Sequence, residues 1–327
     1  MGWEWVVCIV VLGLLFDYTN GFHDAANVVS TVIATRALAP IAAIVMAGVL
    51  NTIGALQASG VAQTIATGLV QETSATEPLV IAALVGAIVW NFATWYLGMP
   101  SSSSYALIGG LIGASLVEGG TGIILWDGLI KKVIIPMVVS PFLGFGIAFL
   151  FMKAIYRWGQ GKKYARIYRY LQVGSGALMA LSHGVNDAQK SMGIITLGLV
   201  AAGFLHTTAI PLWVILACAI TMGVGTASGG FRIIRVVGFK ITKISPPQGF
   251  AAEVSASLVI LTASFFGMPI SSSQMITGSV SGVGTAKGVK EVEWRLGKGI
   301  AATWLLTLPG AAGISALTFF IIHIFLK

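Results

Sequence analysis

Charge is what this sequence has least of. Only 9% of its 327 residues are Asp, Glu, Lys or Arg, and 56% are hydrophobic, whereas a soluble domain carries about 25% charged residues. The mean hydropathy is +0.91. This composition excludes an ordinary soluble globular protein. The apolar runs have the length of transmembrane helices, and they lack the alternating pattern of membrane β-barrels.

Cysteine is also scarce. The two cysteines, Cys8 and Cys218, both lie in apolar runs, so we interpret them as packing residues rather than as a disulfide or metal ligands. The sequence contains no Gly-x-Ser-x-Gly elbow, which argues against a serine hydrolase. The net charge of +8 comes from basic residues clustered between apolar runs. It indicates membrane orientation by the positive-inside rule, and not binding to nucleic acid.

What the sequence does contain is two polar motifs, each occurring twice and in the same order. The motif NGFHDAAN at residues 20–27 has a counterpart in HGVNDAQK at 183–190, with a shared Gly-x-x-Asp-Ala core. The motif GMPSSSS at 98–104 has a counterpart in GMPISSS at 267–273. Two motifs that recur in order indicate internal duplication.

The charges between the apolar runs predict how the two copies are oriented. Residues 156–170 are strongly basic and therefore cytoplasmic. The connection at 61–77 carries acids but no Lys or Arg, whereas its second-half counterpart at about 231–248 is basic. Opposite charge in equivalent connections is typical of two repeats that are inserted in the membrane in opposite orientations. We expect a first membrane repeat at 1–155, the basic cytoplasmic linker at 156–170, and a second, inverted repeat at 171–327.

The predicted fold class is an all-α integral membrane protein. We expect two inverted-topology repeats with broken or re-entrant helices, and about 10–12 transmembrane segments. Each half would cross an odd number of times, which places both termini outside. Lys131 and Lys132, which this scheme also places outside, fit it less well.

The first repeated motif carries groups suited to cation binding. On a helix, Asn20, Asp24 and Asn27 lie on one face, and Asp24 and Asn27 offer hard oxygen ligands suited to Na⁺, Mg²⁺ or a proton. A charged Asp in hydrocarbon costs about 3 kcal/mol even on lenient scales, so a carboxylate there is a functional candidate. In the second copy Lys190 stands where Asn27 stands in the first. It could pair with Asp187, approach an anion, or replace a metal cation.

The second repeated motif is suited to anion binding. Proline is tolerated at a helix start, and the serines behind it would crowd a helix N-terminus with hydroxyl and N–H donors. A lone membrane serine is more often an interhelical contact, but two runs in register favour a cage for a tetrahedral oxyanion. The candidates are Ser101, Ser102, Ser103, Ser104, Ser271, Ser272 and Ser273.

Several other polar residues leave two interpretations open. His23 and His183 are either packing residues or proton-handling groups. Glu253 is a buried-acid candidate, with Asn51 taken as its first-half counterpart. Asp17 is either a proton site or an interhelical hydrogen-bonding residue.

Together, the four ordered motifs resemble the duplicated signature of the inorganic phosphate transporter (PiT) family. Within that family they look most like the bacterial low-affinity phosphate permeases. The resemblance runs nearly end to end, and it implies inverted repeats, secondary active transport of inorganic phosphate, a homodimer, and neither an enzymatic activity nor a cofactor. It also implies coupling to H⁺ or Na⁺, and the bacterial permeases can accept phosphate complexed with divalent metal.

The resemblance assigns roles to residues of this chain. For the phosphate cage the resemblance carries over Ser102, Ser103, Ser104, Ser271, Ser272 and Ser273, and we add Ser101, Gln189 and Lys190 to the phosphate-binding set. For the coupling cation or proton it carries over Asp24, Asn27 and Asp187, and we add Asn186, His23 and Glu253. With Na⁺, the metal ligands would be Asp24, Asn27 and Asp187. This chain has Tyr105 and Gln274 where many members have His, which puts a proton role there in doubt. Sodium-coupled members tend to have Asn in place of His23 and Lys190, which favours protons here.

The leading hypothesis is therefore a multi-pass symporter that imports phosphate through the cytoplasmic membrane. The nearest alternative is a sulfate or other oxyanion permease of the same architecture, but the acidic motifs kept in both halves argue against it. A passive channel is a further alternative, as is an intramembrane hydrolase that uses Asp24, His23 and a serine. The expected partners are inorganic phosphate, the lipid bilayer and a second copy of the chain, with no nucleic acid.

Overall fold

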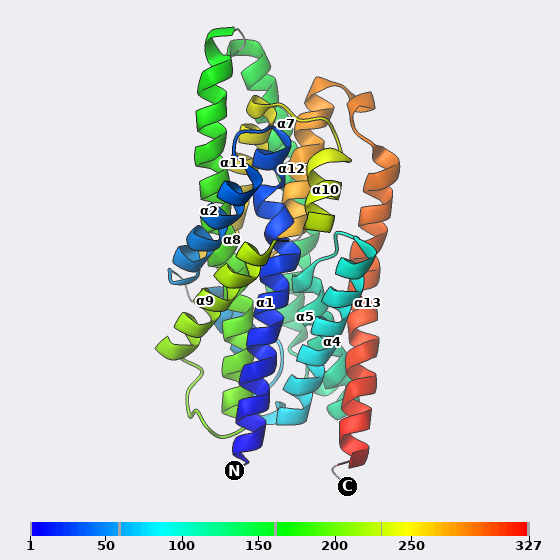
Figure 1. The fold of residues 1–327 in the computed structure, drawn as a ribbon. Coiled ribbons are helices and arrows are strands. Elements are labelled where there is room, and N and C mark those ends of the chain that lie inside the picture. The colour runs from blue at the N-terminus through cyan, green and yellow to red at the C-terminus, as the bar shows by residue number, and fades with distance from the viewer. Residues whose placement is uncertain (1, 58–59, 160–161, 230, 326–327) are drawn as a thin grey trace.

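A computed structural model of the protein describes residues 2–57, 60–159, 162–229 and 231–325 and shows a bundle of helices (Figure 1). The helices of the first half are α1 Trp3–Ala34, α2 Pro40–Ala55, α3 Gly60–Thr67, α4 Glu77–Leu97, α5 Ser103–Glu118, α6 Trp126–Gly128 and α7 Ile135–Trp158. Those of the second half are α8 Lys162–Ala201, α9 Leu212–Ser228, α10 Phe231–Phe239, α11 Pro246–Phe265, α12 Ser272–Lys287 and α13 Trp294–Phe325. The described residues form no β-strand, which confirms the all-α prediction.

The membrane spans differ in kind. By length and apolarity, five described spans can cross a membrane, and the bent pairs α2–α3 and α9–α10, at 67° and 72°, raise the number to seven. The apolar α5 is too short for this test. The 40-residue α8 is not among the apolar spans, because it carries the second polar motif and several basic residues. The prediction of a multi-pass helical membrane protein with broken helices is confirmed.

The two halves pack on each other reciprocally. Helix α1 packs against α9 and α10, as α8 packs against α2 and α3; likewise α5 packs against α13 and α12 against α7. Equivalent backbone bonds occur in each half, where Leu125 N–H donates to Leu69 O and Glu293 N–H donates to Ile241 O, both at 2.9 Å. Both termini lie at one end of the bundle, and α8 begins at the other (Figure 1).

The repeated Gly-Met-Pro sequence breaks each span inside the bundle. Gly98 after α4 and Gly267 after α11 both have φ +67°, a left-handed conformation that glycine adopts without strain. The next residue closes each helix end, because Met99 N–H donates to Thr94 O at 2.9 Å and Met268 N–H donates to Ala263 O at 2.8 Å. Proline then prevents the helix from continuing, and a new helix begins at the serines.

Three connections are more helical than the sequence analysis expected. The stretch 61–77 contains most of α3, and the stretch 118–132 gives way at Trp126 to a helical segment that runs through Trp158. In the linker 156–170, α7 continues to Trp158 and α8 starts at Lys162, so most of it is helix rather than loop; residues 160–161 lie outside the described residues. Basic residues favour helix, and here they extend the ends of long helices. Lys131 is paired with Asp127 at 2.6 Å, which offsets its charge.

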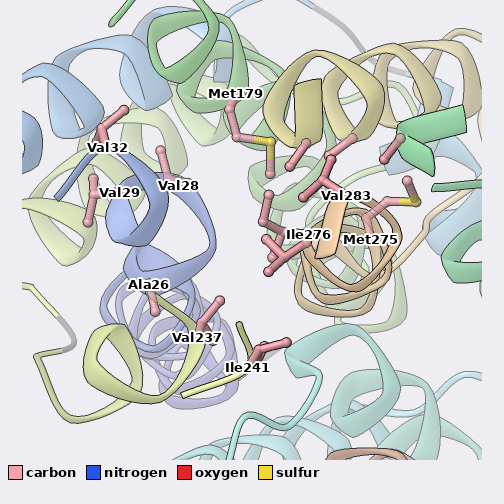
Figure 2. Packing of buried hydrophobic residues seen from close by; sticks show 14 of the residues in the cluster. Ala26, Val28, Val29, Val32, Met179, Val237, Ile241, Met275, Ile276 and Val283 are labelled. Atoms are coloured by element: carbon pink, nitrogen blue, oxygen red, sulfur yellow. The ribbon is translucent and has the colours of Figure 1, made fainter. Parts of the chain in front are cut away.

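Small and β-branched side chains hold the second half of α1 against its neighbours. Figure 2 shows this cluster, in which valines of α1 lie near Met179 of α8 and residues of α10 and α12. Its labelled members are Ala26, Val28, Val29, Val32, Met179, Val237, Ile241, Met275, Ile276 and Val283. The packing fixes the helical segment that follows the first motif.

The glycine in each Gly-x-x-Asp-Ala motif allows two helix backbones to touch. A Cβ on Gly21 would lie 2.7 Å from the carbonyl oxygen of Met222, and one on Gly184 would lie 2.2 Å from that of Asn51. No real Cβ approaches a backbone so closely. The glycines therefore set the distance from α1 to α9 and from α8 to α2, and so position the aspartates three residues later.

We predict that Gly184→Val destabilises the protein, because the added side chain must push α2 away from α8. Overpacking of this kind costs about 1–3 kcal/mol. Gly174→Ala on the same helix is the matched control, since a Cβ there meets nothing within 4 Å. Thermal unfolding of the purified proteins in detergent measures both, and equal midpoints for the two variants would contradict the prediction.

Candidate functional site

The two motif aspartates meet at the centre of the bundle. Ligand atoms of Asp24 on α1, Asp187 on α8 and His183 on α8 all lie within 4.8 Å of one another. Asp24 is 2% exposed and the other two are 0% exposed. Two carboxylates so close in a buried site repel each other, so the site needs positive charge or a proton to be stable.

The two carboxylates have different partners. Asp24 Oδ1 lies 3.0 Å from Nδ1 of His23, and Ser272 donates a long hydrogen bond of 3.4 Å to Oδ2. Asp187 Oδ1 accepts a hydrogen bond from the Lys190 ammonium at 2.5 Å, and its Oδ2 lies 3.6 Å from His183 Nε2. The second copy of the motif thus contains a resident cation, and the first copy does not.

The Lys190 ammonium joins three parts of the chain. Besides Asp187, it donates to the Ser104 hydroxyl at 2.5 Å and to the Ile270 carbonyl at 2.8 Å. These contacts connect α8 to the first turn of α5 and to the segment that leads into α12. Lys190 is 1% exposed, so its charge acts in a low-dielectric site.

Each serine run forms the N-terminus of a buried helix. Ser102 caps α5 by accepting from Tyr105 N–H at 3.2 Å, and Ser271 caps α12 by accepting from Gln274 N–H at 3.4 Å. All seven serines are no more than 2% exposed. Two positive helix ends therefore lie inside the protein rather than at its surface.

The two serine runs bond to each other crosswise. Ser273 donates to the Ser101 carbonyl at 2.9 Å, and Ser104 donates to the Ile270 carbonyl at 3.2 Å. The Ser103 hydroxyl is buried and has no hydrogen-bond partner among the described residues. The two helix ends thus face one another, with at least one hydroxyl left for a ligand.

His23 connects the first carboxylate to the first serine run. Its Nε2 lies 3.2 Å from the Ser101 hydroxyl, which in turn lies 2.8 Å from Thr94 on α4. His183 is held in a different way, with Nδ1 at 3.1 Å from the Asn51 amide oxygen on α2. The sequence analysis did not single out Thr94, and it assigned Asn51 another role. A polar residue inside an apolar run was the only available signal for either.

Two predicted site residues have structural partners. Asn186 donates to the Ser264 hydroxyl at 2.7 Å and to the Met268 carbonyl at 3.4 Å, and so fastens the end of α11. Gln189 accepts from the N–H groups of Val61 and Ala62 at 2.9 and 3.2 Å, which caps α3. The roles predicted for them in ion or phosphate binding stay predictions. Asn27 is 1% exposed, and its Nδ2 has no partner among the described residues.

Glu253 lies apart from the central carboxylates. It is 0% exposed on α11 and accepts hydrogen bonds from Thr31 on α1 and Ser175 on α8. Thr31 lies seven residues beyond Asp24, or about 10 Å along the helix. The assignment of Asn51 as its first-half counterpart is wrong, because Asn51 belongs to α2, whereas α11 corresponds to α4.

We predict that Lys190→Gln strongly destabilises the protein in Na⁺-free buffer, because it leaves the Asp187 charge buried and unpaired. Breaking one side of such a pair costs about 3–5 kcal/mol. The double variant Asp187→Asn with Lys190→Gln should recover part of that loss, since neither charge remains. Thermal unfolding in detergent tests this, and a double variant no more stable than Lys190→Gln would show that the ion pair is not the cause.

Comparison with known proteins covers almost the whole chain. A family model described as the phosphate transporter family matches residues 20–315. A protein of Mycobacterium bovis with the name "Probable low-affinity inorganic phosphate transporter" is 46% identical over 97% of this chain and 78% of its own length. One of Bacillus subtilis is 41% identical over 97% of both chains.

The fold also matches a solved structure. A protein titled the sodium-dependent phosphate transporter superposes with a TM-score of 0.88 at 23% identity, over 98% of this chain and 99% of that one. At this identity the match shows the shared fold.

Proposed function

The chain belongs to the phosphate transporter family, and we propose that it imports inorganic phosphate through the cytoplasmic membrane as a secondary active symporter. It is a multi-pass phosphate permease and not an enzyme. One observation carries the proposed mechanism: two serine-capped helix N-termini meet, through crossed hydrogen bonds, beside a pair of buried carboxylates.

Phosphate binds between the N-termini of α5 and α12. Free backbone N–H groups, the serine hydroxyls and the positive helix ends are complementary to a tetrahedral oxyanion. The Ser103 hydroxyl, which has no hydrogen-bond partner in the described part of the chain, is one donor available to it, and the Lys190 ammonium beside Ser104 adds a full positive charge. Repacking of Ser101, Ser104 and Ser273 would free further donors when the site opens.

The charges of the site set the number of coupling cations. Asp24 and Asp187 together carry two negative charges, of which Lys190 neutralises one. The positive ends of α5 and α12 balance the other, so a bound phosphate anion requires one further cation. Asp24 with Asn27 is the place for that cation, because the equivalent place in the second copy holds Lys190. Because Lys190 and His23 stand where sodium-coupled members of the resembled family tend to have Asn, we favour H⁺ over Na⁺ as that cation. Phosphate complexed with a divalent metal is a second form of the substrate.

Alternating access arises from movement of one repeat against the other. The proposed units of motion are residues 1–155 and 171–327, related by inversion and joined through the basic segment 156–170. Support comes from the reciprocal packing of the two halves, which places their polar motifs at one point. Association of two copies in the membrane stays a prediction from the resemblance.

Uptake of ³²P-phosphate into liposomes containing the purified protein tests this function. We expect an inward H⁺ gradient to drive accumulation without Na⁺, and Asp24→Asn to abolish accumulation while the protein stays folded by gel filtration. Normal accumulation by Asp24→Asn would contradict the assigned coupling role. Phosphate uptake that requires Na⁺ would identify Na⁺ rather than H⁺ as the coupling cation. Equilibration of phosphate across the membrane without accumulation would indicate a channel. Inhibition of phosphate uptake by sulfate would favour a permease for oxyanions in general.

We predict that Lys190→Asn makes phosphate uptake depend on an additional cation, because it recreates in the second copy the Asp-x-x-Asn pattern of the first. At saturating phosphate, uptake by this variant should rise with Na⁺ concentration, whereas wild-type uptake under a pH gradient should not. Lys190→Met is the matched control, since it removes the charge without supplying an oxygen ligand. If both variants respond to Na⁺ alike, Lys190 does not stand in for a cation.

A further inference from the structure

Asp17 is a buried carboxyl group that the proposed mechanism does not use. It lies on α1 with 0% exposure, and its Oδ1 accepts a hydrogen bond from the Ser191 hydroxyl of α8 at 2.6 Å. Its Oδ2 has no hydrogen-bond partner among the described residues. Within that part of the chain, no Lys, Arg or His lies at salt-bridge distance from it.

Asp17 is aligned with the central site. It precedes Asp24 by seven residues, which is two turns or about 10 Å on the same face of the helix. Ser191 likewise follows Asp187 by one turn on α8. Asp17 therefore lies on the side of the central carboxylates where α1 begins, the end of the bundle that holds both termini (Figure 1).

Asn20 lies between the two carboxyl groups of α1. It is 0% exposed, and both its amide nitrogen and its amide oxygen lack hydrogen-bond partners among the described residues. Burying two unmade hydrogen bonds costs about 1–3 kcal/mol each. A polar side chain kept there on the face of Asp17 and Asp24 indicates that a small polar ligand, such as water, occupies this position during transport.

The surroundings of Asp17 disfavour a negative charge. On α9 the ionisable side chain is Cys218, a buried thiol. On α8 the ionisable residues next to Ser191 in the helix are Asp187 and Lys190, which are paired with each other. Helix α4, packed on another side of α1, has ionisable side chains only near its ends, at Glu77 and Tyr96. On α10 the described ionisable side chain is Arg235, and this helix packs near Ser30, far along α1. A buried carboxylate without a counter-ion takes up a proton instead.

We propose that Asp17 is a proton-binding site through which the coupling proton reaches and leaves the central carboxylates. The Asp17 carboxylate takes one proton on Oδ2 from the side of the termini and becomes a neutral acid, with the Ser191 hydroxyl still bonded to Oδ1. It then gives the proton to water beside Asn20, which passes it to Asp24. No electrons move, and the carboxylate is regenerated. This role rests on the proposed proton-coupled phosphate symport.

Asp17→Asn in liposomes separates proton movement from phosphate movement. We expect loss of concentrative uptake driven by a pH gradient, while exchange of labelled for unlabelled phosphate at equal pH persists, because exchange does not require the proton to leave. Normal concentrative uptake would overturn the proposal. Loss of both activities in a folded protein would also overturn it, since Asp17 would then be needed for phosphate binding or for movement of the repeats.

Two further variants exclude a purely structural role. Asp17→Glu should restore part of the concentrative uptake. Ser191→Ala should shift the pH profile of uptake to higher pH, because the carboxylate loses the hydroxyl that stabilises its charged form; an unshifted profile would contradict this. The infrared difference spectrum between the wild type and Asp17→Asn should contain the carbonyl band of a protonated carboxyl group.

The wild-type protein distinguishes failure of this inference from failure of the function on which it rests. If the wild-type protein takes up no phosphate under an H⁺ gradient or a Na⁺ gradient, the proposed function itself is wrong. A wild type driven by Na⁺ alone keeps the symport but overturns the proton site at Asp17.

Discussion

The structure depends on one electrostatic constraint: two carboxylates, one from each half of the chain, are buried within 4.8 Å of a shared histidine and must be neutralised there. The Lys190 ammonium meets half of that need. Because it also bonds to Ser104 and to the Ile270 carbonyl, the charge that stabilises Asp187 holds the start of α5 against the approach to α12. Neutralisation of the carboxylates and assembly of the proposed anion site thus depend on one interaction, which explains why the two repeated motifs occur together.

The backbone makes this assembly possible. The left-handed glycines at 98 and 267 end α4 and α11 inside the bundle, and proline prevents either helix from continuing. Each break produces a helix N-terminus away from water, where its positive end is poorly solvated and strongly favours an anion. The motif glycines Gly21 and Gly184 then allow α1 and α8 to approach α9 and α2 closely enough to bring both aspartates to these ends.

The sequence predicted the parts of this site that depend on local chemistry. Both helix starts at the serines, the break after each Gly-Met-Pro and the burial of the motif aspartates follow from turn residues and from the cost of burying charge. It could not predict which hydrogen bonds the amides make, because these depend on helices distant in the chain: Gln189 caps α3, and Asn186 fastens α11. The helical parts of 61–77 and 156–170 were also missed. Helix α3 has no charged residue and lies in a stretch interpreted as a connection, whereas the basic residues of 156–170 extend the ends of α7 and α8. Asp17 was left with two interpretations, because its partner Ser191 lies 174 residues away.

The difference between the two motif copies determines the charge of the proposed site and therefore how cation binding is coupled to phosphate binding. In the proposed site, Asp24 and Asp187 contribute two negative charges and Lys190 one positive charge, while each facing helix N-terminus contributes about half a positive charge. With neutral histidines, the empty site is then close to neutral. A monovalent phosphate alone makes it negative, a cation alone makes it positive, and both together return it to neutrality. Because a net charge in a closed, low-dielectric site is costly, only the empty and the doubly loaded forms close readily. The proposed symport follows from this charge balance, which requires that the second copy hold a lysine where the first holds Asn27.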